Sequence, residues 1–186
     1  KIYGINVGDS LSGSFSNSGN ITILASADVN ASSSGNLNID DVYGLEIDGE
    51  IDGNFSSSGT ISLSVNASGQ SSVDISVSDI MGLYLDSDVG GSATHSGSIT
   101  VGVNVENSSE DVELYDIRGL KNYGAISDFT NSGSITVNVD AEIVSSGSLE
   151  ARDISGIYFS GGNNGFTNSG DIDVNVKVAA DSNSAK

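Results

Sequence analysis

The chain has 186 residues, a formal net charge of −19 and 24 glycines, and it contains no proline, cysteine or tryptophan. Only six residues are lysine or arginine, so the chain lacks the basic surface that binding to nucleic acid or to an anionic membrane requires. The absence of cysteine excludes disulfides and thiolate metal sites, and no apolar run reaches the roughly 18 residues that span a bilayer.

One repeat organises the whole chain, with five units over residues 1–40, 41–78, 79–115, 116–152 and 153–186. Each unit opens with the pattern Asp-(Ile/Val)-x-Gly-(Ile/Leu), except that Lys1 takes the place of the aspartate in the first unit. The four aspartates in this position are Asp41, Asp79, Asp116 and Asp153. A short segment of variable length follows, which is typical of a surface turn.

The next element of each unit is a turn made of two small polar residues and a glycine. These turn glycines are Gly19, Gly59, Gly97, Gly133 and Gly170, which lie 40, 38, 36 and 37 residues apart. A phenylalanine stands four residues before the glycine in every unit but the third, where Ala93 replaces it. We expect the glycine to supply a positive φ angle. His95, the only histidine, occupies the asparagine position of the third turn, and we interpret it as a turn substitution.

A long alternating strand comes after each turn. Its first apolar column is Ile21, Ile61, Ile99, Ile135 and Ile172. The period of two predicts that one face of the strand is buried and the other lies in water. A Ser/Asn/Gly-rich loop and a second alternating strand then lead back to the aspartate. The buried parity shifts there, from Ile39 to Val42, which predicts a corner at which the chain bends.

Like residues at the same phase of successive units predict stacked rungs about 4.8 Å apart. The expected fold is therefore all-β, a parallel β-solenoid in a single repeat domain, and we expect a right-handed β-helix. We expect one rung per repeat, because the two halves of the unit differ in signature and length. Two short coils per repeat is the alternative.

The pattern Asn-Ser-Gly-x-Ile-x-Val-x-Val, complete at residues 131–139, recurs together with the x-Gly-(Ile/Leu) element. This combination resembles the β-helical passenger repeats of bacterial autotransporter-type surface adhesins, and the resemblance covers the whole chain. It implies a long, non-enzymatic protein that is secreted or displayed at the cell surface. The partners that it implies are a host or surface glycan or protein.

The aspartate column is the sharpest candidate for a binding site. Stacked like charges repel by about 1 kcal/mol per pair in bulk water, and by more in a drier site. Backbone N–H groups at a solvent-facing corner would relieve this repulsion, and so would a bridging cation such as Ca²⁺, which prefers oxygen ligands. The sequence thus makes calcium a candidate cofactor at Asp41, Asp79, Asp116 and Asp153. The other acids cluster in turns, and we interpret them as a solvated surface.

Three classes of function compete: a structural or adhesive filament segment, a carbohydrate-active β-helix enzyme, and an ice- or glycan-binding solenoid. A catalytic carboxylate pair is expected to break the repeat once, and the sequence contains no such break. We therefore expect no enzymatic activity and favour the first class. Apolar strands at both ends predict that the rod is a piece of a longer repeat protein, stacks end to end with other copies, or both.

Overall fold

The structure is a computed structural model, and it describes residues 1–30, 34–70, 72–107, 111–144 and 147–180. The regular elements within these ranges are all β-strands, arranged in three parallel sheets of five strands each. The described residues include no helix of the length and apolarity that crossing a membrane requires.

Each sheet collects one strand from every repeat. Sheet A contains β1 (Ile2–Val7), β4 (Gly35–Ile47), β7 (Val73–Leu85), β10 (Val112–Asn122) and β13 (Leu149–Phe159). Sheet B contains β2 (Phe15–Asn17), β5 (Phe55–Ser57), β8 (Ala93–His95), β11 (Ile126–Asn131) and β14 (Asn163–Asn168). Sheet C contains β3 (Ile21–Val29), β6 (Thr60–Gly69), β9 (Ser98–Asn107), β12 (Ser134–Ile143) and β15 (Ile172–Ala180).

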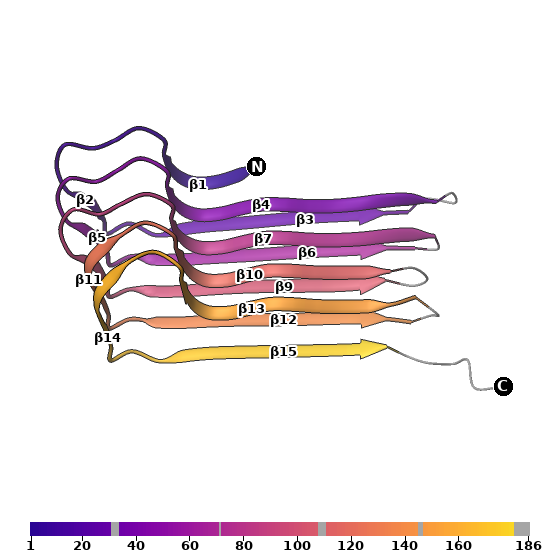
Figure 1. The fold of residues 1–186 in the computed structure, drawn as a ribbon. Coiled ribbons are helices and arrows are strands. Elements are labelled where there is room, and N and C mark those ends of the chain that lie inside the picture. The colour runs from indigo at the N-terminus through magenta and orange to yellow at the C-terminus, as the bar shows by residue number, and fades with distance from the viewer. Residues whose placement is uncertain (31–33, 71, 108–110, 145–146, 181–186) are drawn as a thin grey trace.

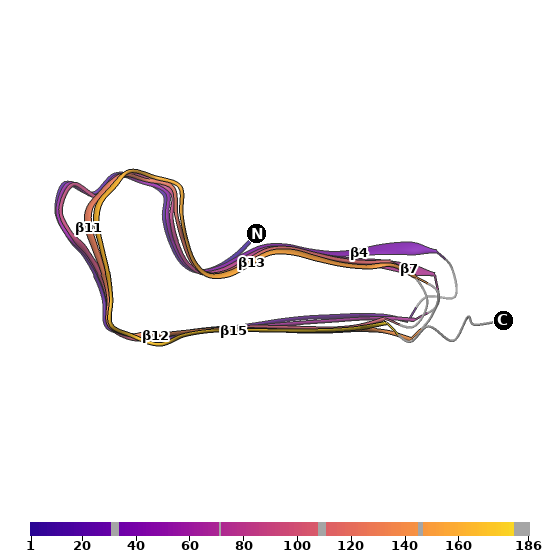
Figure 2. The same ribbon diagram turned by 60° about the horizontal axis from the view of Figure 1, so that its bottom comes forward.

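Three consecutive strands, one from each sheet, make one rung, so β1–β3 form the first rung and β13–β15 the fifth. Each strand pairs in parallel with the equivalent strand one repeat away, so that Ile61 lies between Ile21 and Ile99. Figure 1 shows the rungs stacked along one axis, and in Figure 2 they nearly superimpose. The predicted β-solenoid is confirmed, with one rung per repeat, and the alternative of two coils per repeat is wrong.

The core lies between sheets A and C, which Figure 2 shows as two long layers joined at one end by sheet B. The alternating apolar residues of the long strands point into this core, as the sequence predicts. In the inner rungs these side chains are almost completely buried, as at Ile61, Leu63 and Val65. Sheet A approaches sheet C closely at Gly44, where a Cβ atom would lie 2.4 Å from Ile61 Cγ2. The repeated glycine of the opening pattern is thus explained by close packing between the sheets.

The sequence does not predict the strands of sheet B, which are short and carry the phenylalanine column. Phe15 stacks on Phe55 with ring centroids 5.6 Å apart, and Phe129 lies 6.2 Å from Phe166 by the same measure. Ala93 takes the place of an aromatic ring in the third rung and is fully buried. Sheet B therefore closes the core with aromatic side chains where sheets A and C diverge.

Candidate functional site

The aspartate column lies at the corner within sheet A. Asp41, Asp79, Asp116 and Asp153 have φ angles of 57°, 53°, 52° and 55°, in the left-handed region. Few residues with a side chain tolerate this region, and aspartate is one of them. Val42 is buried immediately after Asp41, which confirms the predicted shift in buried parity. The column therefore has a conformational cause that does not depend on any ligand.

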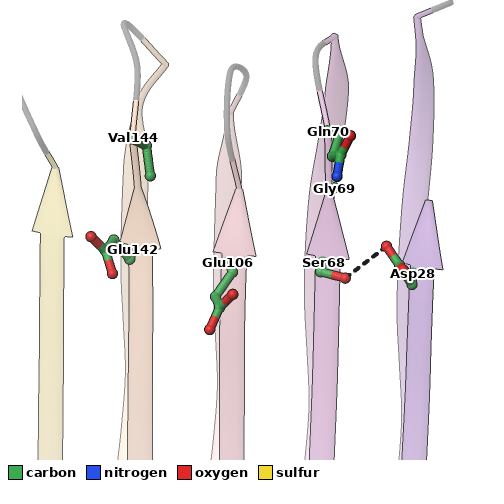
Figure 3. Close-up of a pocket in the computed structure, with 7 residues that line it drawn as sticks. All are labelled: Asp28, Ser68, Gly69, Gln70, Glu106, Glu142 and Val144. Atoms are coloured by element: carbon green, nitrogen blue, oxygen red, sulfur yellow. Dashed lines mark hydrogen bonds between the residues drawn. The ribbon is translucent and has the colours of Figure 1, made fainter. Parts of the chain in front are cut away.

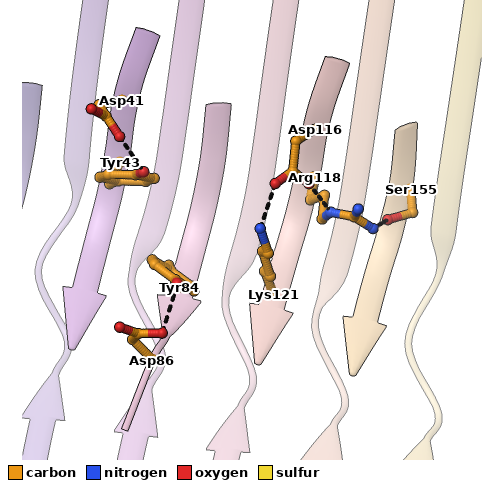
Figure 4. Close-up of polar contacts among 8 residues, drawn as sticks. All are labelled: Asp41, Tyr43, Tyr84, Asp86, Asp116, Arg118, Lys121 and Ser155. Atoms are coloured by element: carbon orange, nitrogen blue, oxygen red, sulfur yellow. Dashed lines mark hydrogen bonds and ion pairs between the residues drawn. The ribbon is translucent and has the colours of Figure 1, made fainter. Parts of the chain in front are cut away.

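Side chains of the same outer face contact two of these carboxylates (Figure 4). The Tyr43 hydroxyl donates a hydrogen bond of 2.7 Å to Asp41 Oδ1, and Lys1 Nζ lies 3.7 Å from the same oxygen. Asp116 accepts hydrogen bonds from Arg118 Nε at Oδ1 and from Lys121 Nζ at Oδ2. Both oxygens of Asp116 are thus engaged by cations of this chain.

Burial and these contacts shift the pKa values of the neighbouring carboxyl groups of Asp79 and Asp116 in opposite directions. Burial raises the pKa of Asp79, and the adjacent Asp116 raises it further. Burial also acts to raise the pKa of Asp116, but hydrogen bonds from Lys121 and Arg118, together with their charges, outweigh it and lower that pKa. Asp116 is therefore the member of the pair that holds its negative charge most firmly.

A ladder of tyrosine rings runs along the same outer face. The rings follow the order Tyr3, Tyr43, Tyr84, Tyr123 and Tyr158, with successive centroids 5.7, 5.6, 5.9 and 6.3 Å apart. Arg118 Cζ lies 4.0 Å from the ring centroid of Tyr158, and Lys121 Nζ lies 4.8 Å from that of Tyr123. The two cations therefore bind both a carboxylate and aromatic faces, which stabilises them although their side chains are nearly buried.

Sequence reasoning missed this ladder, together with Arg118 and Lys121, because its members do not recur at one position of the repeat. Tyr43 stands two residues after its aspartate, whereas Tyr84 stands five after its own. One signal was available: the five ladder tyrosines all fall within seven residues after the first position of a unit. Loose clustering after a corner indicates a shared outer face even where strict periodicity fails.

The four aspartates proposed from the sequence as a calcium site do not form a cluster of metal ligands in the described part of the chain. Among the described residues, no group of three or more His, Cys, Asp or Glu side chains gathers closely enough to hold a metal ion. Side-chain donors of the chain contact Asp41 and Asp116, and these donors reduce the repulsion that a bridging cation would otherwise relieve. Calcium binding at Asp41, Asp79, Asp116 and Asp153 stays a prediction.

The turn glycines were expected to supply a positive φ angle, and this explanation is wrong. No glycine in the described ranges has a positive φ angle. Instead, a Cβ atom on Gly59, Gly97, Gly133 or Gly170 would lie 2.0, 2.1, 1.9 or 1.9 Å from the carbonyl oxygen of the preceding turn glycine. Real Cβ atoms do not approach a backbone oxygen so closely, so contact between rungs requires glycine at these four positions.

Next to these glycines runs a column of polar side chains in sheet B. Asn17, Asn131 and Asn168 each donate an Nδ2 hydrogen bond to the carbonyl of the glycine two residues later, at 3.1, 3.2 and 2.9 Å. His95 takes this place in the third rung and is completely buried, and the backbone of Ser57 and Gly97 lies beside its ring. Burial lowers the pKa of His95 to about 4, and the backbone of Ser57 and Gly97 acts in the opposite direction.

A shallow hollow lies on the outer face of sheet C, towards the loop end of the long strands (Figure 3). Its lining includes Asp28, Glu106 and Glu142, together with Ser68, whose hydroxyl donates a hydrogen bond of 2.9 Å to Asp28 Oδ1. The three carboxylates come from three different rungs, and the described lining contains no basic side chain. This surface accords with the solvated acidic face expected from the sequence.

Comparison with known proteins gives no relative from which a function can be inferred. No protein-family model matches the sequence, and neither a curated protein nor a solved structure matches the chain.

Proposed function

We propose that this chain is a non-enzymatic structural and adhesive segment of a bacterial surface or secreted filament protein. The observation that carries the proposal is the unbroken stack: the parallel register continues from each rung to the next through all five rungs of the described chain. A solenoid of this kind grows in one dimension and presents the same outer faces repeatedly, which suits a rigid spacer with many weak contact points. The sequence resemblance to autotransporter-type passenger repeats supports the same proposal.

The acidic surface supports an extracellular rod. A net charge of −19 on 186 residues keeps copies apart sideways and favours solubility. The partners we propose are a glycan or protein of a host or neighbouring surface, contacted through the outer faces of the sheets. Nucleic acid and membrane insertion are not part of the proposal.

One observation favours the competing class, a carbohydrate-active enzyme. Asp79 and Asp116 are neighbours whose pKa values are displaced in opposite directions, and such pairs serve as acid and base in glycoside hydrolysis. Yet Arg118 and Lys121 donate hydrogen bonds to both oxygens of Asp116 and lower its pKa, which makes this carboxylate a weaker base and a weaker nucleophile. We therefore assign the pair to the corner and not to catalysis.

The surface location of the protein and its adhesion are tested by experiments that do not depend on enzymatic activity. Antiserum raised against the purified chain should label intact cells of the source organism, and protease treatment of those cells should remove the label. Beads coated with the chain should bind to an array of glycans and matrix proteins, whereas beads coated with heat-unfolded chain should not. Label found only after cell lysis would overturn the surface location.

Enzymatic activity is tested on a panel of soluble neutral and acidic polysaccharides. We expect no release of reducing ends above that of an Asp116→Asn variant. Release by the wild-type chain that disappears in this variant would establish the enzyme instead of the filament segment.

A further inference from the structure

The corner of sheet A carries more negative charge than the chain itself compensates there. In the second, third and fourth rungs the corner consists of residues 41–48, 79–86 and 116–123. These segments hold two cations, Arg118 and Lys121, and six carboxylates: Asp41, Glu46, Asp48, Asp79, Asp86 and Asp116. Each of these rungs has a neighbouring rung on both sides, so the excess of charge does not arise at an end of the chain. The field at this corner therefore attracts cations of other molecules.

The chain's own cations show how the outer face of sheet A binds positive charge. Arg118 and Lys121 each contact Asp116 and a ring of the tyrosine ladder. Arg152, farther along the same sheet, has its Nε 3.5 Å from Glu150 Oε1 and its Cζ 5.2 Å from the centroid of another tyrosine ring. Each of these three cations is thus held by a carboxylate and an aromatic ring together.

One column on this face offers the same two groups without a cation of the chain. Asp48, Asp86 and Tyr123 directly follow β4, β7 and β10. They lie in successive rungs, because Asp86 N donates to Ile47 O at 2.9 Å and Tyr123 N donates to Leu85 O at 2.8 Å. Both carboxylates are exposed, and the Tyr123 side chain is 43 % exposed. Within the described ranges, no lysine or arginine forms an ion pair with either carboxylate.

Tyr84 joins this column to the tyrosine ladder. Its hydroxyl donates a hydrogen bond of 2.7 Å to Asp86 Oδ1 (Figure 4), and its ring centroid lies 5.9 Å from that of Tyr123. The hydrogen bond holds the carboxylate beside the ring. Asp48 and Asp86 repel each other across successive rungs, and a cation placed between them would be attracted to both.

We propose that the outer face of the sheet A corner binds a basic segment of a partner protein, with a lysine or arginine side chain seated at Asp48, Asp86 and the rings of Tyr84 and Tyr123. The bound cation takes up the two kinds of contact that Lys121 makes one rung later, with a carboxylate and with aromatic rings. This inference rests on the proposed function as an adhesive segment, and it names the class of partner and the face that contacts it.

The weakness of single surface contacts favours a basic segment over an isolated amine. One exposed ion pair or one exposed cation–π contact contributes little binding energy. Several cations on one peptide bind together more tightly, because the first contact holds the others close to the face. The corner suits such a ligand, since it presents carboxylates in three successive rungs at Asp41, Asp79 and Asp116.

Fluorescence anisotropy of a labelled peptide of alternating lysine and serine, titrated with the full 186-residue chain, tests the docking. We expect saturable binding that weakens as salt is added, and no binding of the same peptide with glutamate in place of lysine. The double variant Asp48→Asn, Asp86→Asn should weaken binding by about tenfold. Its matched control is Asp74→Asn, Glu113→Gln, which removes the same charge from exposed positions elsewhere on sheet A and should change affinity by less than about twofold.

The aromatic contribution is tested without any change of charge. Tyr123→Leu should weaken peptide binding by about threefold. Tyr115→Leu, on the same sheet but outside the tyrosine ladder, should leave the affinity unchanged. Far-UV circular dichroism and the urea midpoint establish that each variant is folded. Should the double aspartate variant fail to fold, Asp86→Asn alone serves in its place, with a loss of about fivefold expected.

Four results overturn the docking. These are the absence of peptide binding, equal losses in the two double variants, a Tyr123→Leu chain that binds like the wild type, and a neutral oligosaccharide that displaces the peptide and itself depends on Tyr123. The second would reveal general attraction to an acidic chain, and the fourth would assign the face to a glycan. Antibody labelling of intact cells does not involve the peptide, so the surface location and this inference fail separately.

Discussion

The buried imidazole of His95 should make the folded chain less stable in mild acid, and replacing His95 with asparagine should remove this loss of stability. The imidazole is completely buried, and burial lowers its pKa from 6.5 to about 4. Above pH 6.5 the ring is neutral in both the folded and the unfolded chain, so it makes no pH-dependent contribution. Between pH 6.5 and pH 4 the unfolded chain binds a proton that the folded chain does not, and stability falls as the pH falls. Below pH 4 both states are protonated and the loss is complete.

The size of this loss follows from the two pKa values. The difference between 6.5 and about 4 is about 2.5. Each pH unit changes the free energy of unfolding by about 1.4 kcal/mol, so the full loss is about 3 kcal/mol, and most of it has occurred by pH 4.5. The 25 aspartates and glutamates also titrate in acid, and only a comparison with a variant that lacks the imidazole separates the two effects.

Asparagine is the matched replacement, because it occupies the same column at Asn17, Asn131 and Asn168, where it bonds to a glycine carbonyl. Urea unfolding of the wild type and of His95→Asn, followed by circular dichroism at pH 7.5 and pH 4.5, measures the effect. The difference in unfolding free energy between the two proteins should change by roughly 2–3 kcal/mol between these pH values. The imidazole proton signals of the single histidine should titrate in the folded chain with a midpoint near 4. A constant difference between the proteins, or a midpoint near 6.5, would refute the reasoning.

Two further predictions concern the strand register and the corner. Val101→Asp should destabilise the chain by about 3–5 kcal/mol in urea unfolding because it buries an unpaired charge. Thr100→Asp, on the outer side of the same strand and between uncharged neighbours, should change stability by less than about 1 kcal/mol, and equal losses would show that the register is wrong. If calcium bridges the aspartate column, the melting temperature should be higher in millimolar Ca²⁺ than in chelator, and an unchanged melting temperature would leave Arg118 and Lys121 as the cations that compensate Asp116. A rise with Ca²⁺ that a double Asp79→Asn, Asp116→Asn variant abolishes would establish calcium binding along the column.

The fold could be predicted because it depends on features that repeat. The alternation in the long strands and the constant phase of the isoleucine column require stacked parallel strands, and Ile61 pairs with Ile21 and Ile99 as that phase predicts. The corner at Asp41 could be located from the shift in buried parity alone. What the sequence could not provide is the physical reason for glycine at the turns, which is that a side chain there would collide with the carbonyl group of the preceding turn. The glycine pattern is compatible with a positive φ angle and with close backbone approach, and only coordinates distinguish the two.

The aspartate corner shows why the candidate site was only partly predictable. Its left-handed backbone is a local requirement of each rung, so it recurs and the sequence displays it. At two of the four aspartates, side chains of the outer face compensate the negative charge, and they differ between the two rungs: the Tyr43 hydroxyl and the Lys1 ammonium at Asp41, and the Arg118 guanidinium and the Lys121 ammonium at Asp116. The left-handed backbone therefore repeats at the aspartate of each of these rungs, whereas the side chains that compensate the aspartate charge do not repeat. In a solenoid of this kind, the side chains on the outer face that do not repeat give each rung its own surface. The aspartate column repeats because the backbone of the corner requires it, so it is evidence for the fold more than for a binding site.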